Sequence, residues 1–157
     1  MISVLSGFVP TVFIDYRPLQ GGLINLASVA GSVTKLPLRT HSQLSISCLH
    51  VLEHIGLGRY GDPMNPDGTR QAAIEIQRIL APGGSLYLSL PIGRERVCFN
   101  AHRVHHADTV RNLFSELVLK SFSLVDDLGR FHNQADFQYA SAQDYGCGLF
   151  EFERSNA

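Results

Sequence analysis

The residues with the most distinctive chemistry in this sequence lie in the segment HVLEH, residues 50–54. Two histidines, His50 and His54, flank the carboxylate of Glu53, and on a helix this spacing can bind zinc with the glutamate as general base. Here the segment starts at an expected strand end and runs into the glycine-rich GLGRYG, with no third ligand at a helical position. A zinc hydrolase is therefore a minor alternative, and we expect no metal site.

The glycine-rich loop that follows carries the next group of reactive side chains. Its glycines permit positive φ, so a tight loop can aim Arg59 and Tyr60 at a substrate. A second segment, FNAHRV, contributes Asn100 and Arg103. Two arginines can clamp a carboxylate or phosphate, while the alternative is internal pairing with carboxylates such as Asp62 that holds the two loops together.

The elements around these loops indicate a parallel sheet. Residues 45–50 and 85–92 suit strands, and residues 69–80 carry apolar side chains at helical spacing between them. A helix that joins two strands in this way is the crossover of a parallel pair. Ligands bind beyond the carboxyl ends of such strands, so we expect the two loops to meet there.

The rest of the chain supplies flanking elements. TVFID, residues 11–15, reads as a strand with Asp15 at its tip, where an acidic residue can accept ribose hydroxyls or simply cap a turn. Residues 23–29 suit a second strand. Asp108 should cap a helix, and residues 117–125 and 148–153 read as a closing antiparallel pair joined by a polar connection.

Length and composition point to one ordinary domain, residues 1–157. The chain is 45% hydrophobic and 17% charged, with a net charge of -1 and a pI near 6.6, which disfavours nucleic acid and anionic membranes as partners. Its three cysteines are odd in number and widely spaced, so we expect free, mostly buried thiols in a reducing compartment. No apolar run reaches the roughly 18 residues of a membrane helix, and we expect a cytoplasmic protein.

Four segments in order, FIDYRPL, GSVTKLPL, SCLHVLEHIG and EIQRILAPGGSLYLSLP, resemble the class I S-adenosylmethionine-dependent methyltransferases from their second strand onward. The blocks GLGRYGDPMNPDG and PIGRERVCFNAHRV resemble a small, functionally uncharacterised family within that superfamily. The resemblance implies a three-layer Rossmann-like α/β fold. Its sheet would be mostly parallel with an antiparallel C-terminal strand, and the superfamily's first strand would be absent.

The resemblance also implies where S-adenosylmethionine would bind. It places the ribose against Asp15 and Tyr16, and the adenine against Ser32 and Val33. The methyl donor would face Cys48 and Leu49. The first strand and its glycine-rich loop would precede residue 1. Ser32 replaces an acidic residue frequent at the adenine, and Gln43 and Leu44 replace a Phe-Asp pair. We therefore expect weak or absent cofactor binding in this truncated chain.

The expected function is methyl transfer to an acceptor of unknown identity. Methyl transfer needs alignment and, for an oxygen or nitrogen acceptor, a base, and the candidate bases are His50 and His102. The expected substrate is a small molecule, sugar-like or acidic, held by Arg59, Tyr60, Asn100 and Arg103. The alternative is a non-catalytic relic or interaction module without cofactor. An exposed sheet edge would favour a homo-oligomer.

Overall fold

The computed structural model of the chain describes residues 2–98 and 101–156. The chain divides into two compact units, Met1–Pro37 and Leu38–Ala157. The expectation of a single domain over residues 1–157 stays a prediction.

The first unit contains a pair of parallel strands. After the short helix α1 (Ile2–Leu5), β1 (Thr11–Asp15) pairs in register with β2 (Leu26–Ala30). The β1 strand has the bounds that the sequence predicted, whereas β2 begins and ends later than residues 23–29. The amide of Gly31 donates to the carbonyl oxygen of Asp15 at 3.0 Å, so the carboxyl ends of the two strands lie side by side.

The second unit is built on a mixed sheet of five strands. Its strands, in the order β3-β4-β9-β7-β8, are Gln43–Leu49, Leu80–Ile92, Gly146–Glu153, Val118–Val125 and Phe131–His132. Only β3 and β4 are parallel, and the other three pairs are antiparallel. The expected mostly parallel sheet is therefore wrong, because β1 and β2 form a sheet of their own and β9 enters antiparallel beside β4. The expected absence of a first strand stays a prediction.

The strand β3 lies at one edge of this sheet. Its side chains are therefore more exposed than those of a strand inside the sheet. Leu44 is 71% exposed, whereas Cys48 is buried. The sheet order pairs β3 with β4 alone within its sheet. The expectation that an open edge pairs with a second copy of the chain stays a prediction.

The helix α2 (Gly68–Ile79) runs directly into β4. Pro82 and the two glycines after it follow the helix, as expected, but they lie within the strand as an irregular segment. Gly83 has φ +73°, and the β3 register slips between the pairs Gln43–Leu80 and Ser45–Ser85. Glycine is required at position 84, where a Cβ would stand 2.8 Å from the carbonyl oxygen of Ala81.

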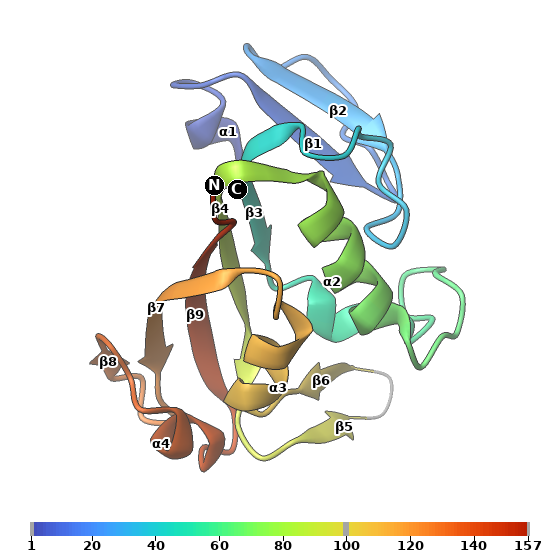
Figure 1. The fold of residues 1–157 in the computed structure, drawn as a ribbon. Helices are drawn as coiled ribbons and strands as arrows, with labels where there is room; N and C mark the ends of the chain where they lie inside the picture. The colour runs from blue at the N-terminus through green and yellow to red at the C-terminus, as the bar shows by residue number, and fades with distance from the viewer. Residues whose placement is uncertain (1, 99–100, 157) are drawn as a thin grey trace. The chain divides into compact units, whose positions relative to one another are not determined.

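Helices α2 and α3 (Ala107–Leu113) lie in front of the sheet in the view of Figure 1. The apolar stripe of α2 is buried, as its spacing predicted, and so are the alternating leucines of β4 at positions 86, 88 and 90. The predicted cap of α3 is wrong. His106 is the N-cap and its ring accepts from the amide of Asp108, because Asp108 lies already in the first turn.

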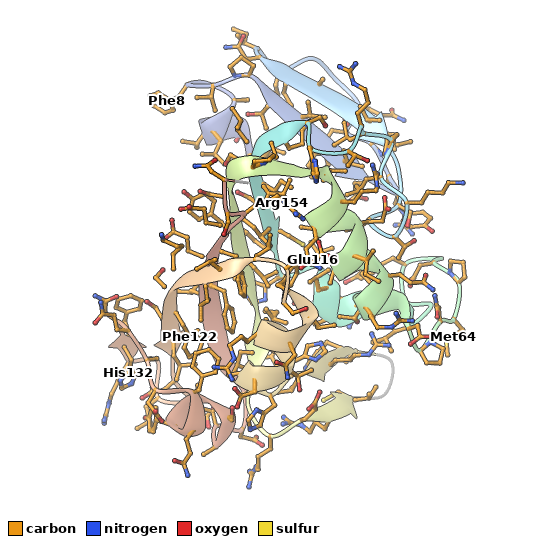
Figure 2. The ribbon with its side chains drawn as sticks, viewed as in Figure 1. Phe8, Met64, Glu116, Phe122, His132 and Arg154 are labelled. Carbon is orange, nitrogen blue, oxygen red and sulfur yellow. The ribbon has the colours of Figure 1, made fainter. Side chains whose placement is uncertain are left out.

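Aromatic side chains fill the core between the helices and the last strands. The rings of Phe122 and Phe150 stack at 4.5 Å, and Phe114 lies 5.2 Å from Phe152. Figure 2 labels Phe122 on β7, and Glu116 and Arg154 beside α2. Arg154 donates to Gln77 O at 2.7 Å and to Glu116 at 3.2 Å, which ties the end of β9 to α2.

Four short elements lie between or beyond these strands. A hairpin of β5 (Arg96–Cys98) and β6 (His102–Val104) was not predicted from the sequence, nor was the 3-10 helix η1 (Leu52–His54). The predicted antiparallel pair of β7 and β9 is confirmed. The polar connection between them holds β8 and a short helix, α4 (Phe137–Ser141).

Two expectations drawn from composition concern thiols and membranes. The three cysteines are free, as expected, but only Cys48 is buried, while Cys98 and Cys147 are partly exposed. Within residues 2–98 and 101–156, no helix has the length and apolar character needed to cross a membrane. The cytoplasmic location stays a prediction.

Candidate functional site

The end of β3 presents an imidazole that a buried carboxylate orients. His50 adopts φ +54° just past the strand, and its amide donates to Ser89 O at 2.8 Å. Its Nδ1 lies 3.1 Å from Oε1 of Glu53, which η1 carries. The His50 side chain is 51% exposed and that of Glu53 only 1%. A carboxylate only accepts, so Nδ1 is the donor and Nε2 of the neutral ring is left as an acceptor.

A thiol from the far end of the sequence faces that free nitrogen. The Sγ of Cys147, on β9, lies 3.5 Å from Nε2 of His50. Strand pairing sets Cys147 opposite Pro91, near the carboxyl end of β4. Burial and then the charge of Glu53 raise the pKa of Cys147, so the sulfur is a neutral thiol near neutral pH. The Cys147 thiol, the His50 imidazole and the Glu53 carboxylate therefore form a chain of polar contacts.

Two further histidines complete what we call the base cluster, namely His50, Glu53, His54, His102 and Cys147. His54 donates from Nδ1 to Ala101 O at 2.8 Å, and its Nε2 lies 3.8 Å from Glu53. The His102 ring lies 6.3 Å from that of His54 and 5.0 Å from that of Tyr145. Burial and the neighbouring His54 lower the pKa of His102, so its ring is neutral and able to accept a proton at neutral pH.

The loop after η1 is closed by one carboxylate. Asp62 accepts from the amides of Gly56 at 2.8 Å, Tyr60 at 3.2 Å and Gly58 at 3.4 Å. Burial alone would raise the pKa of Asp62, but these backbone donors lower it below its ordinary value. Glycine is needed at position 56, where φ is +78° and a Cβ would collide with the carbonyl group of Asn65.

The two loops meet, as the sequence predicted. Arg59 donates to Ala101 O at 3.0 Å, and Arg103 donates to Ile55 O at 2.6 Å and to Thr69 Oγ1 at 3.3 Å. The chemistry of the contact differs from the expected pairing with Asp62 or Glu53. Both guanidinium groups bind backbone carbonyls, because the backbone amides of the loop already occupy Asp62.

The other predicted substrate residues differ in what the structure says of them. The Tyr60 ring packs edge-on against His54 at 5.4 Å, with the Arg59 guanidinium 5.6 Å from its centre. Asn100 lies outside the described residues. Arg59, Tyr60 and Arg103 thus surround the base cluster or the loop beside it, and their binding of substrate stays a prediction.

The predicted cofactor residues belong to both units. In the first unit, the Asp15 carboxylate is exposed and accepts from Arg17 N at 2.9 Å, and Tyr16 is 47% exposed. Ser32 and Val33 follow β2, whose last residue pairs with Asp15. The second unit holds the remaining pair, Cys48 and Leu49, at the end of β3.

The buried Cys48 thiol is expected to be unreactive. Burial, followed by the charge of Glu53, raises the pKa of Cys48 to about 12, so the thiol stays protonated and packs as an apolar group. Sequence reasoning missed the two β9-side residues of the site, Cys147 and Tyr145. No local spacing relates them to residues 50–54, because strand pairing alone brings them there.

The geometry of HVLEH differs from that of a helical zinc site. His50 lies at a strand end and His54 on a 3-10 helix, and both rings face Glu53 rather than a common ligand position. Among the described residues, no group of three His, Cys, Asp or Glu side chains is placed to hold a metal ion. The zinc alternative therefore has no geometric support.

Several solved structures that resemble this chain in fold are methyltransferases. The [4+2]-cyclase SpnF aligns with a TM-score of 0.60 at 15% identity, over 85% of this chain and 58% of its own. A Burkholderia thailandensis 1,6-didemethyltoxoflavin-N1-methyltransferase with bound S-adenosylhomocysteine aligns with a TM-score of 0.60 at 12% identity. The alignment covers 94% of this chain and 62% of that protein. The Bradyrhizobium japonicum N-methyltransferase NodS, also with S-adenosylhomocysteine, aligns with a TM-score of 0.54 at 20% identity. The alignment covers 90% of this chain and 64% of NodS.

These likenesses define the class of fold. The chain spans less than two thirds of each of these three proteins, and at such identities the likeness shows the fold alone. The fold is the Rossmann-like α/β fold of S-adenosylmethionine-dependent methyltransferases, with a mixed sheet.

The sequence then gives the family. Residues 40–145, more than half of the chain, match the family described as Caenorhabditis protein of unknown function, DUF268, and the chain belongs to that family. No curated protein matches the sequence.

Proposed function

We propose that the protein is an S-adenosylmethionine-dependent methyltransferase in which His50 is the general base. The observation that carries this proposal is the line from buried Glu53 to exposed His50 at the carboxyl end of β3. In a sheet of this fold that end is where ligands bind. Two solved methyltransferases with this fold contain bound S-adenosylhomocysteine, which supports the choice of cofactor class.

The chain offers side chains of the right chemistry for the cofactor. Asp15, at the tip of β1, presents an exposed carboxylate suited to ribose hydroxyls, and Ser32 and Val33 follow the neighbouring strand tip. When bound, S-adenosylmethionine would supply an activated methyl group.

The residues of the base cluster would remove a proton from the acceptor. Nε2 of His50 accepts that proton, and the buried carboxylate of Glu53 stabilises the imidazolium that forms. Glu53 is thus a positioning residue, because it holds the ring through Nδ1. Arg59 and Tyr60 would help to align a small, sugar-like or acidic acceptor.

The proposal is tested by calorimetric titration with S-adenosylhomocysteine. We expect measurable binding by the wild type, and Asp15→Asn should weaken it by about 1 to 3 kcal/mol, roughly 10- to 100-fold, through loss of charged hydrogen bonds. Asp67→Asn, at an exposed carboxylate of the second unit, is the matched control and should bind normally. Absence of binding by the wild type would favour the alternative, a non-catalytic relic that keeps the fold.

The geometry favours a second candidate function, in which Cys147 itself is a nucleophile. The order thiol, imidazole, carboxylate is that of cysteine sites activated by histidine. In an alkylation, Sγ would bond to the electrophilic carbon, the bond from that carbon to the leaving group would break, and the thiol proton would pass to His50 Nε2.

Iodoacetamide and intact-mass measurement separate these two functions. If Cys147 is a nucleophile, it should be alkylated at least tenfold faster than the partly exposed Cys98, and His50→Gln should slow its reaction alone. Cys147→Ser would then abolish the reaction in which Cys147 is the nucleophile. If His50 is only a base, Cys147→Ser should leave methyl transfer nearly intact, and the two cysteines should react at similar rates.

A further inference from the structure

A pocket of about 310 Å³ lies in the second unit and is lined by residues of α2, β5, β6 and α3 and of the segments beside them. Figure 1 shows the β5-β6 hairpin beside α3 and near the N-terminal end of α2. We call this cavity the oxyanion pocket. The polar side chains that line it are Thr69, Arg70, Glu95, Arg96, Arg103, His105 and Thr109. None of these residues except Arg103 takes part in the function proposed above.

The guanidinium groups of the lining supply hydrogen-bond donors that suit an anion. Three guanidinium groups face one carboxylate, that of Glu95, which Thr109 Oγ1 already contacts at 2.9 Å. Arg96 donates to Asp144 O at 2.8 Å and lies 3.6 Å from the Asp144 carboxylate, and Arg70 lies 3.5 Å from the Asp67 carboxylate. A guanidinium carries five N–H donors, so these bonds fix the arginines and leave donors for a ligand.

The end of a long helix adds to this field. Thr69 and Arg70 belong to the first turn of α2, a helix of 12 residues with no acidic side chain in that turn. Its N-cap, Asp67, makes no side-chain capping hydrogen bond. The partial positive charge of the helix N-terminus therefore has no carboxylate partner within the first turn.

A buried histidine that lacks hydrogen bonds points independently to a ligand. His105 is only 5% exposed and lines the pocket, yet neither of its ring nitrogens has a hydrogen-bond partner among the described residues. Oε1 of Glu95 lies 3.7 Å from Nδ1 of His105, beyond hydrogen-bond length. Buried polar groups are nearly always satisfied, so an unpaired ring that lines a pocket points to a ligand in that pocket.

We propose that the oxyanion pocket binds a small organic phosphate, with Arg70, Arg96 and Arg103 around the phosphate and His105 donating to it. The carboxylates of Asp67, Asp144 and Glu95 offset the charges of the three arginines, so recognition of the phosphate rests on the N–H donors of the guanidinium groups and of His105 rather than on net charge. The pocket also has room for a carrier group beyond the phosphate itself. The site stands on its own residues and does not depend on methyl transfer.

The electrostatics of His105 agree with a site that is completed by an anion. Burial lowers the pKa of His105, Glu95 opposes that shift and Arg103 adds to it. An anion bound beside the ring would favour the protonated form, with two N–H donors.

The test is calorimetric titration of the full chain with glycerol 3-phosphate, inorganic phosphate, acetate and glycerol. We expect glycerol 3-phosphate to bind most tightly, phosphate less tightly, and glycerol not at all. Arg70→Gln combined with Arg96→Gln should weaken glycerol 3-phosphate binding at least tenfold. Arg130→Gln, at an exposed arginine of the β7-β8 turn, is the matched control and should bind as the wild type does.

Three outcomes would overturn the proposal. They are no binding of glycerol 3-phosphate, binding no tighter than that of acetate, and binding that the double arginine variant leaves unchanged. Arg103 is left intact because its bond to Ile55 holds the loops together. His105→Asn provides the second variant, and it should weaken phosphate binding without loss of the folded state, as circular dichroism would show.

Discussion

The two sides of β6 carry opposite kinds of chemistry. His102 belongs to the base cluster, whereas Arg103 and His105 line the oxyanion pocket, and this arrangement follows the alternation of side chains along an extended chain. On one side, histidines gather around a buried carboxylate. On the other, arginines gather around a buried histidine.

The two regions also differ in which buried polar atoms lack a hydrogen-bond partner. In the base cluster, Oε2 of Glu53 is a buried acceptor without a partner among the described residues. In the oxyanion pocket, both ring nitrogens of His105 lack one. The first region therefore has an unpaired buried acceptor, and the second has the unpaired nitrogens of a buried ring, so the two regions suit different ligand groups.

The largest effect should follow from removal of the exposed ring in the base cluster. His50→Gln should lower methyl transfer by roughly 10²- to 10⁴-fold, the range expected for loss of general-base catalysis. The melting temperature should change little, because the His50 side chain is 51% exposed. Release of S-adenosylhomocysteine with a panel of small sugar-like and acidic acceptors measures the activity, and His41→Gln, at an exposed loop histidine, is the control.

A smaller effect should follow at the loop that joins the two regions. Asp62→Asn removes the charge that accepts from three backbone amides, so the free energy of unfolding should fall by about 1 to 3 kcal/mol. Urea denaturation measures it. Asp67→Asn, whose side chain is 63% exposed and makes no capping bond, should change the stability by less than about 0.5 kcal/mol. Equal losses in the two variants would mean that the loop does not depend on Asp62.

The smallest effect concerns pH. Burial lowers the pKa of His105 and of His102 below the ordinary value of 6.5, so the folded chain binds fewer protons than the unfolded chain just below that pH. This stability is fully present above about pH 6.5 and is lost as the pH falls through the folded pKa values. Urea denaturation at several pH values measures the loss.

The two histidines can be separated by variants and by an anion. His105→Leu should make the acid loss of stability shallower, and His102→Gln should do the same independently. Sulfate, which remains a dianion over this range, should oppose the loss in the wild type and in His102→Gln but not in His105→Leu. A sulfate effect that survives His105→Leu would contradict the distinction between the two sides of β6.

Patterns within a few residues predicted much of the second unit. The helical spacing of Ala72, Ala73 and Ile76 predicted α2, and the alternation in residues 86–90 predicted the buried face of β4, because each periodicity belongs to one element. The meeting of the two loops was predictable as well, since parallel neighbours end at the same edge.

Pairing between distant segments was decided by the tertiary structure. The mixed sheet depends on β9 lying beside β4, and the contact of Cys147 with His50 depends on that same register, across 97 residues of sequence. The oxyanion pocket likewise joins side chains from α2, β5, β6 and α3. Local spacing determines which face of an element is apolar, but the partner of an exposed polar group depends on which strands pair, and that is a property of the whole packed chain.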